Sequence, residues 1–296
     1  MTERPPTIDP VAAERWERAT PARPPWLHEE VGRRMQDRLQ WIRLQPAAWA
    51  DWEPLRGGLE TGSLVARRYP KSERFVVQAR AERSQDAIKS IAKPWWQRLI
   101  GPATHFGPVP DGAVQMLWAN MALHMAADPQ ALIAQWHRAL ATDGFLMFSC
   151  LGPDSLRELR PLYQSLGWPP PAHEFTDMHD WGDMLVAAGF AEPVMDMERI
   201  VLTWETPGGL LRELRELGSN LHPTRFEALR GRGFRARLEG ALAGSLRGED
   251  GRLALTFEII YGHALKPAPR LKVSAQSAIS LRDMRALLQA DKPSRG

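Results

Sequence analysis

The stretch VQMLWANMALHMAADPQALIAQWHRALATDGFLMFSCLGPDSLRELR, residues 114–160, decides the fold class. A short apolar run, Val114–Trp118, is followed by a segment whose apolar side chains recur at helical spacing. We expect Asp143–Gly144 to end that helix, and Phe145–Cys150 is a second apolar run of strand length. Strand, helix and strand in this order predict a βαβ unit, which requires a parallel sheet.

The chemistry of such a sheet is expected at the carboxyl ends of its strands, because ligands of open α/β sheets bind in the crevice outside those ends. Asn120 follows the first of the two strands, so we expect it at a ligand site. Cys150 ends the second strand. Its apolar surroundings favour inert packing over use as a nucleophile.

The rest of the chain predicts further elements of an α/β domain. An amphipathic helix is expected over Trp26–Leu44, with its apolar residues on one face. Strands are expected at Ala47–Trp52, Arg74–Ala79, Glu192–Trp204 and, half-buried, Leu253–Ala264, and helices at Asp180–Ala188, Gly208–Gly218 and Thr224–Leu242. Lys93–Pro110 predicts no element.

The domain organisation is predicted from composition along the chain. Residues 1–25 are rich in proline and charge and predict a flexible arm. Residues 26–267 predict one α/β domain, a mostly parallel sheet with helices on both faces, and a small helical insertion at about 205–250 predicts a lid. Residues 268–296 predict a basic, polar tail.

Bulk composition excludes several classes of protein. The chain has 296 residues, a hydrophobic content of 44% and a net charge of +3, which is typical of a globular protein. A single cysteine excludes an internal disulfide framework. No signal peptide is apparent, and no segment approaches the roughly 20 apolar residues that span a bilayer. We therefore expect a cytoplasmic protein that binds neither membrane nor nucleic acid.

Several motifs resemble one enzyme family. The run from Trp118 to Ser149 resembles the fourth strand, the following helix and the fifth strand of an S-adenosylmethionine-dependent methyltransferase. The continuation CLGPDSLRELR, HEFTDMHDWGDMLVAAGFAEPVMDMERIVLTW and FEIIYGHALKP resembles the malonyl-acyl-carrier-protein O-methyltransferases of biotin synthesis. The resemblance runs from about Ala113 to Pro267. It implies a Rossmann-like class I fold and methyl transfer from S-adenosylmethionine to the free carboxyl of a malonyl thioester.

The cofactor loop of that family is an acidic residue followed by alternating glycines after the first strand. Here the segment reads DWEPLRGG, in which Gly57 occupies a family glycine position and Gly58 is its neighbour. The resemblance therefore implies Gly57, Gly58 and Asn120 as cofactor-binding residues. The alternative is a plain turn from strand to helix, which glycine pairs also mark.

Three other cofactor positions depart from the family. The acidic residue at the end of the second strand, which holds the ribose, falls near Arg80, where a guanidinium offers donors instead of acceptors. The acid expected near the third strand falls at Ala103, and the tyrosine of the arm falls at Arg23. These departures favour an alternative function, a non-catalytic methyltransferase-like protein that has lost its cofactor and serves as a binding or regulatory partner.

The substrate half keeps the family pattern better. Ser155, Arg157 and Arg160 lie just past the fifth strand, and arginine binds carboxylates through two parallel hydrogen bonds. With His173 they are the substrate-binding candidates, the alternative being a solvated helix with charge partners. The motif HEFTDMHD at 173–180 is not expected to bind a metal, since no further ligand cluster accompanies it, and Asp180 is the expected N-cap of the next helix.

A basic run in the predicted lid points to a partner. It comprises Arg225, Arg230, Arg232, Arg235 and Arg237. An acyl carrier protein is acidic, so such a face is suited to electrostatic docking. The alternative is an ordinary solvated helix face. Nucleic-acid binding is disfavoured because aromatic residues are not interleaved with the arginines.

Overall fold

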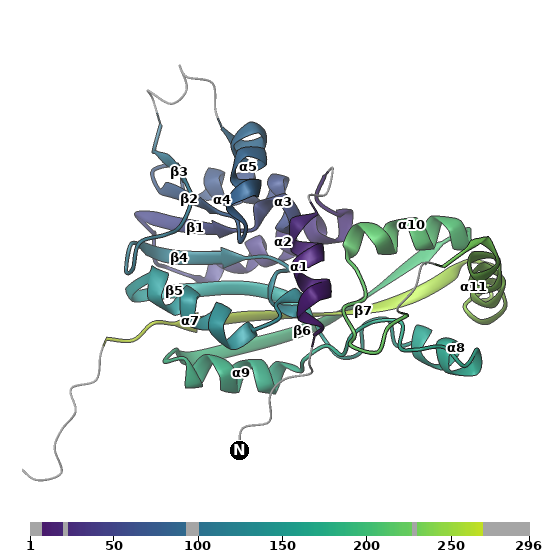
Figure 1. Ribbon diagram of the computed structural model, residues 1–296. Coiled ribbons are helices and arrows are strands. Elements are labelled where there is room, and N and C mark those ends of the chain that lie inside the picture. The colour runs from purple at the N-terminus through teal and green to yellow at the C-terminus, as the bar shows by residue number, and fades with distance from the viewer. Residues whose placement is uncertain (1–7, 20–22, 93–100, 227–229, 269–296) are drawn as a thin grey trace, which may run out of the picture.

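The computed structural model describes residues 8–19, 23–92, 101–226 and 230–268. They form a seven-stranded sheet in the order β3-β2-β1-β4-β5-β7-β6 (Figure 1). Neighbours from β3 to β5 are parallel, whereas β7 runs antiparallel to both β5 and β6. The strands are β1 Ala48–Trp52, β2 Glu73–Val77, β3 Thr104–Phe106, β4 Val114–Ala119, β5 Leu140–Leu151, β6 Ala191–Trp204 and β7 Leu253–Leu265. The predicted mostly parallel sheet is confirmed.

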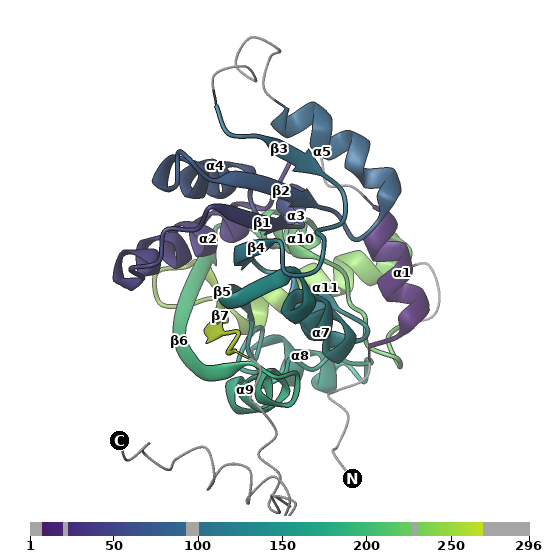
Figure 2. The ribbon, with the colours of Figure 1, turned by 90° about the vertical axis from the view of Figure 1, so that its left-hand side faces the viewer.

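Helices cover both faces of the sheet, as predicted. On one face α2 (Trp26–Arg38) and α4 (Leu59–Arg68) pack over Trp49 and Trp118. On the other face α7 (Pro129–Ala139) and α9 (Met178–Ala187) enclose a second core. Figure 2 shows α2 and α4 on one side of the sheet and α7 on the other. The central strands are therefore buried on both faces, which explains their continuous apolar runs.

The helix of the βαβ unit ends earlier than predicted. It stops at Ala139, and β5 begins at the next residue instead of at Phe145. Asp143 adopts a left-handed conformation, φ 60°, and its N–H donates to the carbonyl of Lys266 at 2.8 Å. Asp143–Gly144 is thus an irregularity inside the strand and not a helix end.

Two other local predictions are corrected. Asp177, not Asp180, is the N-cap of α9: its carboxylate accepts the N–H groups of His179 and Asp180 at 2.6 and 3.3 Å. The segment Lys93–Pro110 contains β3, while residues 93–100 lie outside the described residues.

The predicted flexible arm contains a helix. Within residues 1–25, α1 (Pro10–Arg18) is capped by Asp9, whose side chain accepts the N–H of Val11 at 2.8 Å. Ala12 and Ala13 are buried in a small cluster with Met125 and Leu221. The prediction of a loose arm is therefore wrong for α1, because these tertiary contacts hold it.

The predicted insertion lies between β6 and β7. It carries α10 (Pro207–Leu217), which lies over the long strands β6 and β7, and α11 (Arg232–Ser245), which lies at the far end of these strands near α8 (Leu159–Ser165) (Figure 1). Apart from residue 268, the predicted basic tail lies outside the described residues. Among the described helices, none has the length and apolar composition needed to cross a membrane.

Candidate functional site

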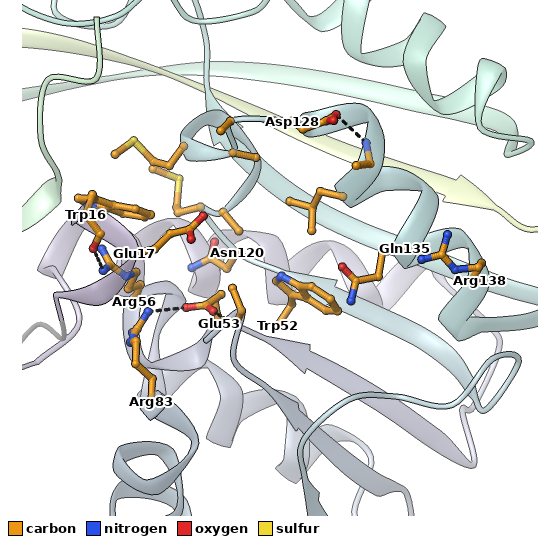
Figure 3. Close-up of a pocket in the computed structure, with 18 residues that line it drawn as sticks. Trp16, Glu17, Trp52, Glu53, Arg56, Arg83, Asn120, Asp128, Gln135 and Arg138 are labelled. Carbon is orange, nitrogen blue, oxygen red and sulfur yellow. Dashed lines mark hydrogen bonds and ion pairs between the residues drawn. The ribbon is translucent and has the colours of Figure 1, made fainter. Parts of the chain in front are cut away.

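A cavity of about 410 Å³ opens where the strand order reverses, at the carboxyl ends of β1 and β4 (Figure 3). This is the crevice in which open α/β sheets bind ligands, and the volume falls in the range of small-molecule sites. Its walls come from α1, the segment after β1, the residues after β2, the loop after β4 and one face of α7. Its polar and aromatic lining residues are Trp16, Glu17, Trp52, Glu53, Arg56, Arg83, Asn120, Asp128, Gln135 and Arg138.

Asn120 fixes the floor of this cavity. Its Nδ2 donates to the carbonyls of His28, at 2.7 Å, and of Gly57, while its Oδ1 accepts the Ser149 hydroxyl at 2.7 Å. The side chain is buried and ties α2, the loop after β1 and β5 to the end of β4. Asn120 therefore lines the cavity, as expected from the rule that ligands bind at the carboxyl ends of the strands (the strand-end rule). Its side-chain amide is already hydrogen-bonded within the protein.

Gly57 and Gly58 are required for close approach. A Cβ on Gly57 would lie 2.7 Å from the backbone oxygen of Asn120, and one on Gly58 would lie 2.7 Å from Glu29 Oε2. Gly58 also has φ 138°, a conformation that favours glycine. The structure brings Gly57 against Asn120 but does not place either glycine among the residues that line the cavity. Their contact with a cofactor stays a prediction.

Glu53 occupies the turn directly after β1. It adopts a left-handed conformation, φ 56° and ψ 44°. Its N–H donates to the carbonyl of Val77 at 2.8 Å, and its carboxylate accepts the N–H of Ala79 and pairs with Arg83 Nη1 at 2.9 Å. A buried carboxylate thus joins the ends of β1 and β2 inside the cavity wall.

Arg56 holds α1 against the segment that follows β1, at the wall of the cavity. Its guanidinium lies 3.5 Å from the ring centre of Trp16 and donates to the carbonyls of Trp16 and Ala19. Burial lowers the pKa of this guanidinium to about 10. It remains charged at neutral pH, so a cation–π contact and charge-assisted hydrogen bonds hold the arm helix in place.

The positions that depart from the expected cofactor pattern make protein contacts. Arg80 leaves the end of β2 toward α1, where it pairs with Glu17 at 3.1 Å and Glu14 at 3.5 Å. Ala103 accepts the N–H of Arg74 through its carbonyl at 3.0 Å, as part of the sheet. Arg23 is exposed and does not line the cavity.

The lining of the cavity fits a nucleoside ligand, because it combines unpaired buried polar atoms with an apolar wall. Among the described residues that line the cavity, three buried guanidinium nitrogens lack a protein partner: Arg56 Nε and Arg83 Nε and Nη2. Unpaired buried donors and acceptors call for a ligand or water. An apolar wall of Trp52, Ala122 and Leu132 faces this polar side. Such a two-sided cavity suits S-adenosylmethionine, the cofactor that the resemblance implies.

The substrate-binding candidates after β5 lie away from the cavity. Ser155 is buried, and its hydroxyl exchanges hydrogen bonds with the backbone of Glu258 at 3.1 and 3.0 Å. Arg157 is half exposed, near Asp154 at 3.7 Å, and Arg160 donates to the carbonyl of Pro153. None of the three lines the cavity, so their role toward a substrate stays a prediction.

His173, the fourth substrate-binding candidate, does not line the cavity, and its role toward a substrate stays a prediction. Its Nε2 lies 2.9 Å from the carbonyl of His124, in the short 3₁₀ turn Leu123–Met125 that follows β4. Burial lowers the pKa of both histidines, so both are neutral at pH 7. Within the described residues, no group of three or more histidine, cysteine or acidic side chains is arranged to hold a metal ion.

The buried His28 predicts acid sensitivity. Its Nδ1 lies 2.8 Å from the carbonyl of Arg56, and burial lowers its pKa to about 4 from an ordinary value near 6.5. Because the folded state resists protonation, its stability contribution is complete above pH 6.5 and is lost as the pH falls toward 4. We expect the free energy of unfolding to drop by on the order of 3 kcal/mol over this interval.

Urea unfolding at pH 7, 6, 5 and 4.5 measures this loss. The variant His28→Asn is expected to make the pH dependence shallower by the share of His28, while the buried His124 and His173 keep the rest. The surface variant His179→Asn is the control and should keep the wild-type slope. An unfolding free energy of the wild type that is constant from pH 7 to 5 would contradict the account.

The basic run of the insertion divides into two groups. Arg225 turns inward and pairs with Asp9 at 2.5 Å, and Arg230 lies near the rings of Phe226 and Phe234. Arg232, Arg235 and Arg237 are exposed on α11. A basic surface therefore exists, but it is smaller than the sequence predicts.

The sequence analysis missed the charged lining of the cavity, namely Glu53, Arg56 and Arg83. The strand-end rule that identified Asn120 also applies to β1, so Glu53 was identifiable as the first residue after that strand. No comparable signal marks Arg56 and Arg83, because their positions depend on the path of α3 (Pro54–Gly57) and of the turn after β2.

Known methyltransferases resemble this chain in sequence and fold. Residues 69–148 match the family described as a methyltransferase domain. The malonyl-acyl-carrier-protein O-methyltransferase of Gallionella capsiferriformans is 39% identical over 254 residues, covering 83% of this chain and 86% of the relative. That of Laribacter hongkongensis is 39% identical over 258 residues, covering 82% and 84%. The crystal structure of the YcgJ protein of Bacillus subtilis aligns with a TM-score of 0.51 at 14% identity, covering 82% of this chain and all of that one, and supports the fold.

Proposed function

Since this chain belongs to the family of malonyl-acyl-carrier-protein O-methyltransferases, we propose that it transfers a methyl group from S-adenosylmethionine to the free carboxyl of a malonyl thioester on an acyl carrier protein. The observation that carries the proposal is the 39% identity to such an enzyme over 83% of this chain. The cavity at the reversal of strand order supports it, since that is where a fold of this kind holds a small ligand.

The proposed reaction requires little acid–base catalysis from the protein. S-adenosylmethionine supplies a methyl group on a sulfonium; the carboxylate oxygen forms the new bond to carbon, and the electron pair of the broken bond stays on sulfur. Because the carboxylate is already ionised at neutral pH, no general base is required. The protein contributes orientation and exclusion of water, which agrees with a cavity walled by Trp16, Trp52 and Met125.

The acceptor is proposed to enter between α1 and the insertion. A Cβ on Gly218, directly after α10, would lie 3.2 Å from Met125 Cε and 3.8 Å from Trp16 Nε1. Asp9, the N-cap of α1, connects this helix to the insertion, because its N–H donates to the carbonyl of Leu221 at 2.9 Å. The insertion thus borders the cavity beside the arm helix, where a lid would control access.

Mass spectrometry of the carrier protein tests the proposal. Malonyl acyl carrier protein is incubated with the purified chain and S-adenosylmethionine, and one added methyl group on the thioester is expected. Acetyl acyl carrier protein, which lacks the free carboxyl, is the control and should gain none. An unmethylated malonyl thioester at high enzyme concentration would refute the proposed function.

The exposed arginines of α11 are proposed to dock the acidic carrier protein. Arg235 lies beside Glu239 at 2.8 Å, and Arg232 is exposed one turn before it on α11, while Arg237 lies 5.5 Å from the ring centre of Trp168. Opposite charges at such a rim act mainly on the rate of encounter. We expect the double variant Arg232→Glu with Arg235→Glu to weaken carrier-protein binding in a pull-down by about tenfold or more, an effect that diminishes as salt is raised.

A charge reversal elsewhere is the control for docking. Arg67→Glu alters an exposed arginine in the last turn of α4, on a different helix from the insertion. This variant should bind the carrier protein as the wild type does. Unchanged binding of the Arg232 and Arg235 double variant at low salt would remove α11 from the docking surface.

A cytoplasmic location is part of the proposal. Its support is the single cysteine, Cys150, which is buried and whose pKa burial raises, so that the fold is independent of disulfides. Fractionation of cells that carry the tagged protein should recover it with the soluble contents, and recovery with the periplasm or membranes would contradict this location.

A further inference from the structure

We propose that Glu53 binds the ribose hydroxyls of the cofactor in this chain, taking the role of the acidic residue that is absent from the end of β2. The inference rests on the proposed function, because it concerns the cofactor of that reaction. Arg80, the residue at the expected place, pairs with Glu17 and Glu14 of α1 instead.

Glu53 has the required position. It is the first residue after β1, and its side chain lines the cavity, where Figure 3 shows it between Arg83 and Trp52. Its carboxylate accepts the N–H of Ala79, two residues past β2. A side chain from the β1 turn therefore delivers its carboxylate to the end of β2, the place that a β2 acid would occupy.

The left-handed conformation of Glu53 is costly, although its carboxylate also joins the ends of β1 and β2. A non-glycine residue in the left-handed region costs about 1–2 kcal/mol, which glycine would avoid. The carboxylate is also largely withdrawn from water, with the residue only 8% exposed. Costs of this kind persist mainly at functional sites, so the position favours a ligand-binding role.

The hydrogen-bonding capacity of Glu53 matches a vicinal diol. An ionised carboxylate accepts at about four positions and donates none. The N–H of Ala79 and Nη1 of Arg83 use two of them, leaving acceptors for two hydroxyl donors. Arg83 Nη1, at 2.9 Å, also balances the negative charge of this carboxylate inside the cavity wall.

The other carboxylates on the cavity wall are engaged elsewhere. Glu17 pairs with Arg80 at 3.1 Å, and Asp128 caps α7 by accepting the N–H of Ala131 at 2.9 Å. Of the three acidic residues that line the cavity in the described part of the chain, Glu53 is the one whose carboxylate lies at the ends of β1 and β2.

Ribose-modified ligands test the inference by binding and not by activity. Calorimetry with S-adenosylhomocysteine establishes the affinity of the wild type, and adenosine and 2′,3′-dideoxyadenosine then compete for the site. Hydrogen bonds to a charged group lead us to expect the wild type to prefer adenosine by about tenfold or more. Glu53→Gln, which has the same shape, should reduce this preference to about twofold, and Glu53→Asp should give an intermediate value.

The control is Glu60→Gln, an exposed carboxylate in the first turn of α4 that does not line the cavity, and this variant should keep the wild-type preference. Circular dichroism checks that the variants fold, and the Asp variant keeps the test informative if the Gln variant does not. An unchanged preference in both Glu53 variants would overturn the inference while leaving the proposed function intact. Absence of S-adenosylhomocysteine binding by the wild type would overturn both.

Discussion

Replacing Arg56 with alanine is expected to release α1 from the domain. The variant loses the stacking on Trp16 and leaves the carbonyls of Trp16 and Ala19 without the donor that they have in the wild type. Two charge-assisted hydrogen bonds and a partly desolvated cation–π contact together contribute about 3 kcal/mol. Hydrogen exchange of the α1 amides should become faster by about a hundredfold, which corresponds to that loss.

The same variant is expected to weaken S-adenosylhomocysteine binding, because α1 forms one wall of the cavity through Trp16 and Glu17. The control is Arg18→Ala, which removes an exposed ion pair with Glu14 on the same helix. Such pairs contribute well under about 1 kcal/mol, so exchange in α1 should stay near the wild-type rate. Equal protection of α1 in the Arg56 variant and the wild type would contradict the account.

The substitution Gly57→Ala is expected to disrupt the floor of the cavity. The new methyl group would lie 2.7 Å from the backbone oxygen of Asn120, and a backbone atom at the end of a buried strand has little freedom to move away. Overpacking of this kind costs about 1–3 kcal/mol, and displacement of Asn120 would also disturb its bonds to His28 and Ser149. We expect lower stability in urea and loss of most methyl transfer.

The matched control for this prediction is Gly240→Ala. Gly240 lies within α11, and an added Cβ there meets no atom within 4 Å. Alanine is favoured over glycine in a helix by up to about 1 kcal/mol, so this variant should be as stable as the wild type or more so. A Gly57 variant that unfolds at the wild-type urea concentration and retains full activity would show that the loop tolerates a side chain.

The fold was predictable where burial on both faces imposes continuous apolar runs. Val114–Trp118 carries that signal, and its strand is confirmed as β4. Leu253–Ala264 was predicted as half-buried from its alternation, yet β7 is buried on both faces. One face packs in the core that α2 and α10 cover, and the other in the core that α7 and α9 enclose. The three residues of β3 were missed, since so short a strand depends on its pairing with β2 and carries no pattern of its own.

The arm illustrates a tertiary override of local composition. Prolines and charges before Trp26 predict a loose segment, and no local signal in that stretch foretells that α1 packs on the domain. The decisive partner, Arg56, lies 40 residues away from Trp16 along the chain. Contacts at such separation become visible only once the β1 turn and the arm are placed in space.

The candidate site was predictable at Asn120 but not at Glu53. The end of β4 is recognisable from the strand and helix that flank it. In the β1 turn, the glycine pair is the visible signal, and nothing in the sequence marks Glu53 as facing the cavity. Glu53 takes a conformation that glutamate rarely adopts, so its direction into the cavity follows from the backbone and not from the residue type. Arg80 lies just past β2, whereas Ala103 precedes β3 and so lies at the amino end of that strand. The contacts of Arg80 with α1 and of Ala103 with β2 were not foreseeable.

Calorimetric titration of the purified wild-type chain with S-adenosylmethionine and S-adenosylhomocysteine tests the central claim most directly. The claim is that a cavity walled by Glu53, Arg56 and Trp16 in place of a fully glycine-rich loop still holds the cofactor. We predict saturable binding of both ligands, with dissociation constants between about 1 μM and 1 mM, the usual range for enzyme substrates. An absence of heat change at millimolar ligand would contradict the account, and it would favour a methyltransferase-like protein that works without the cofactor.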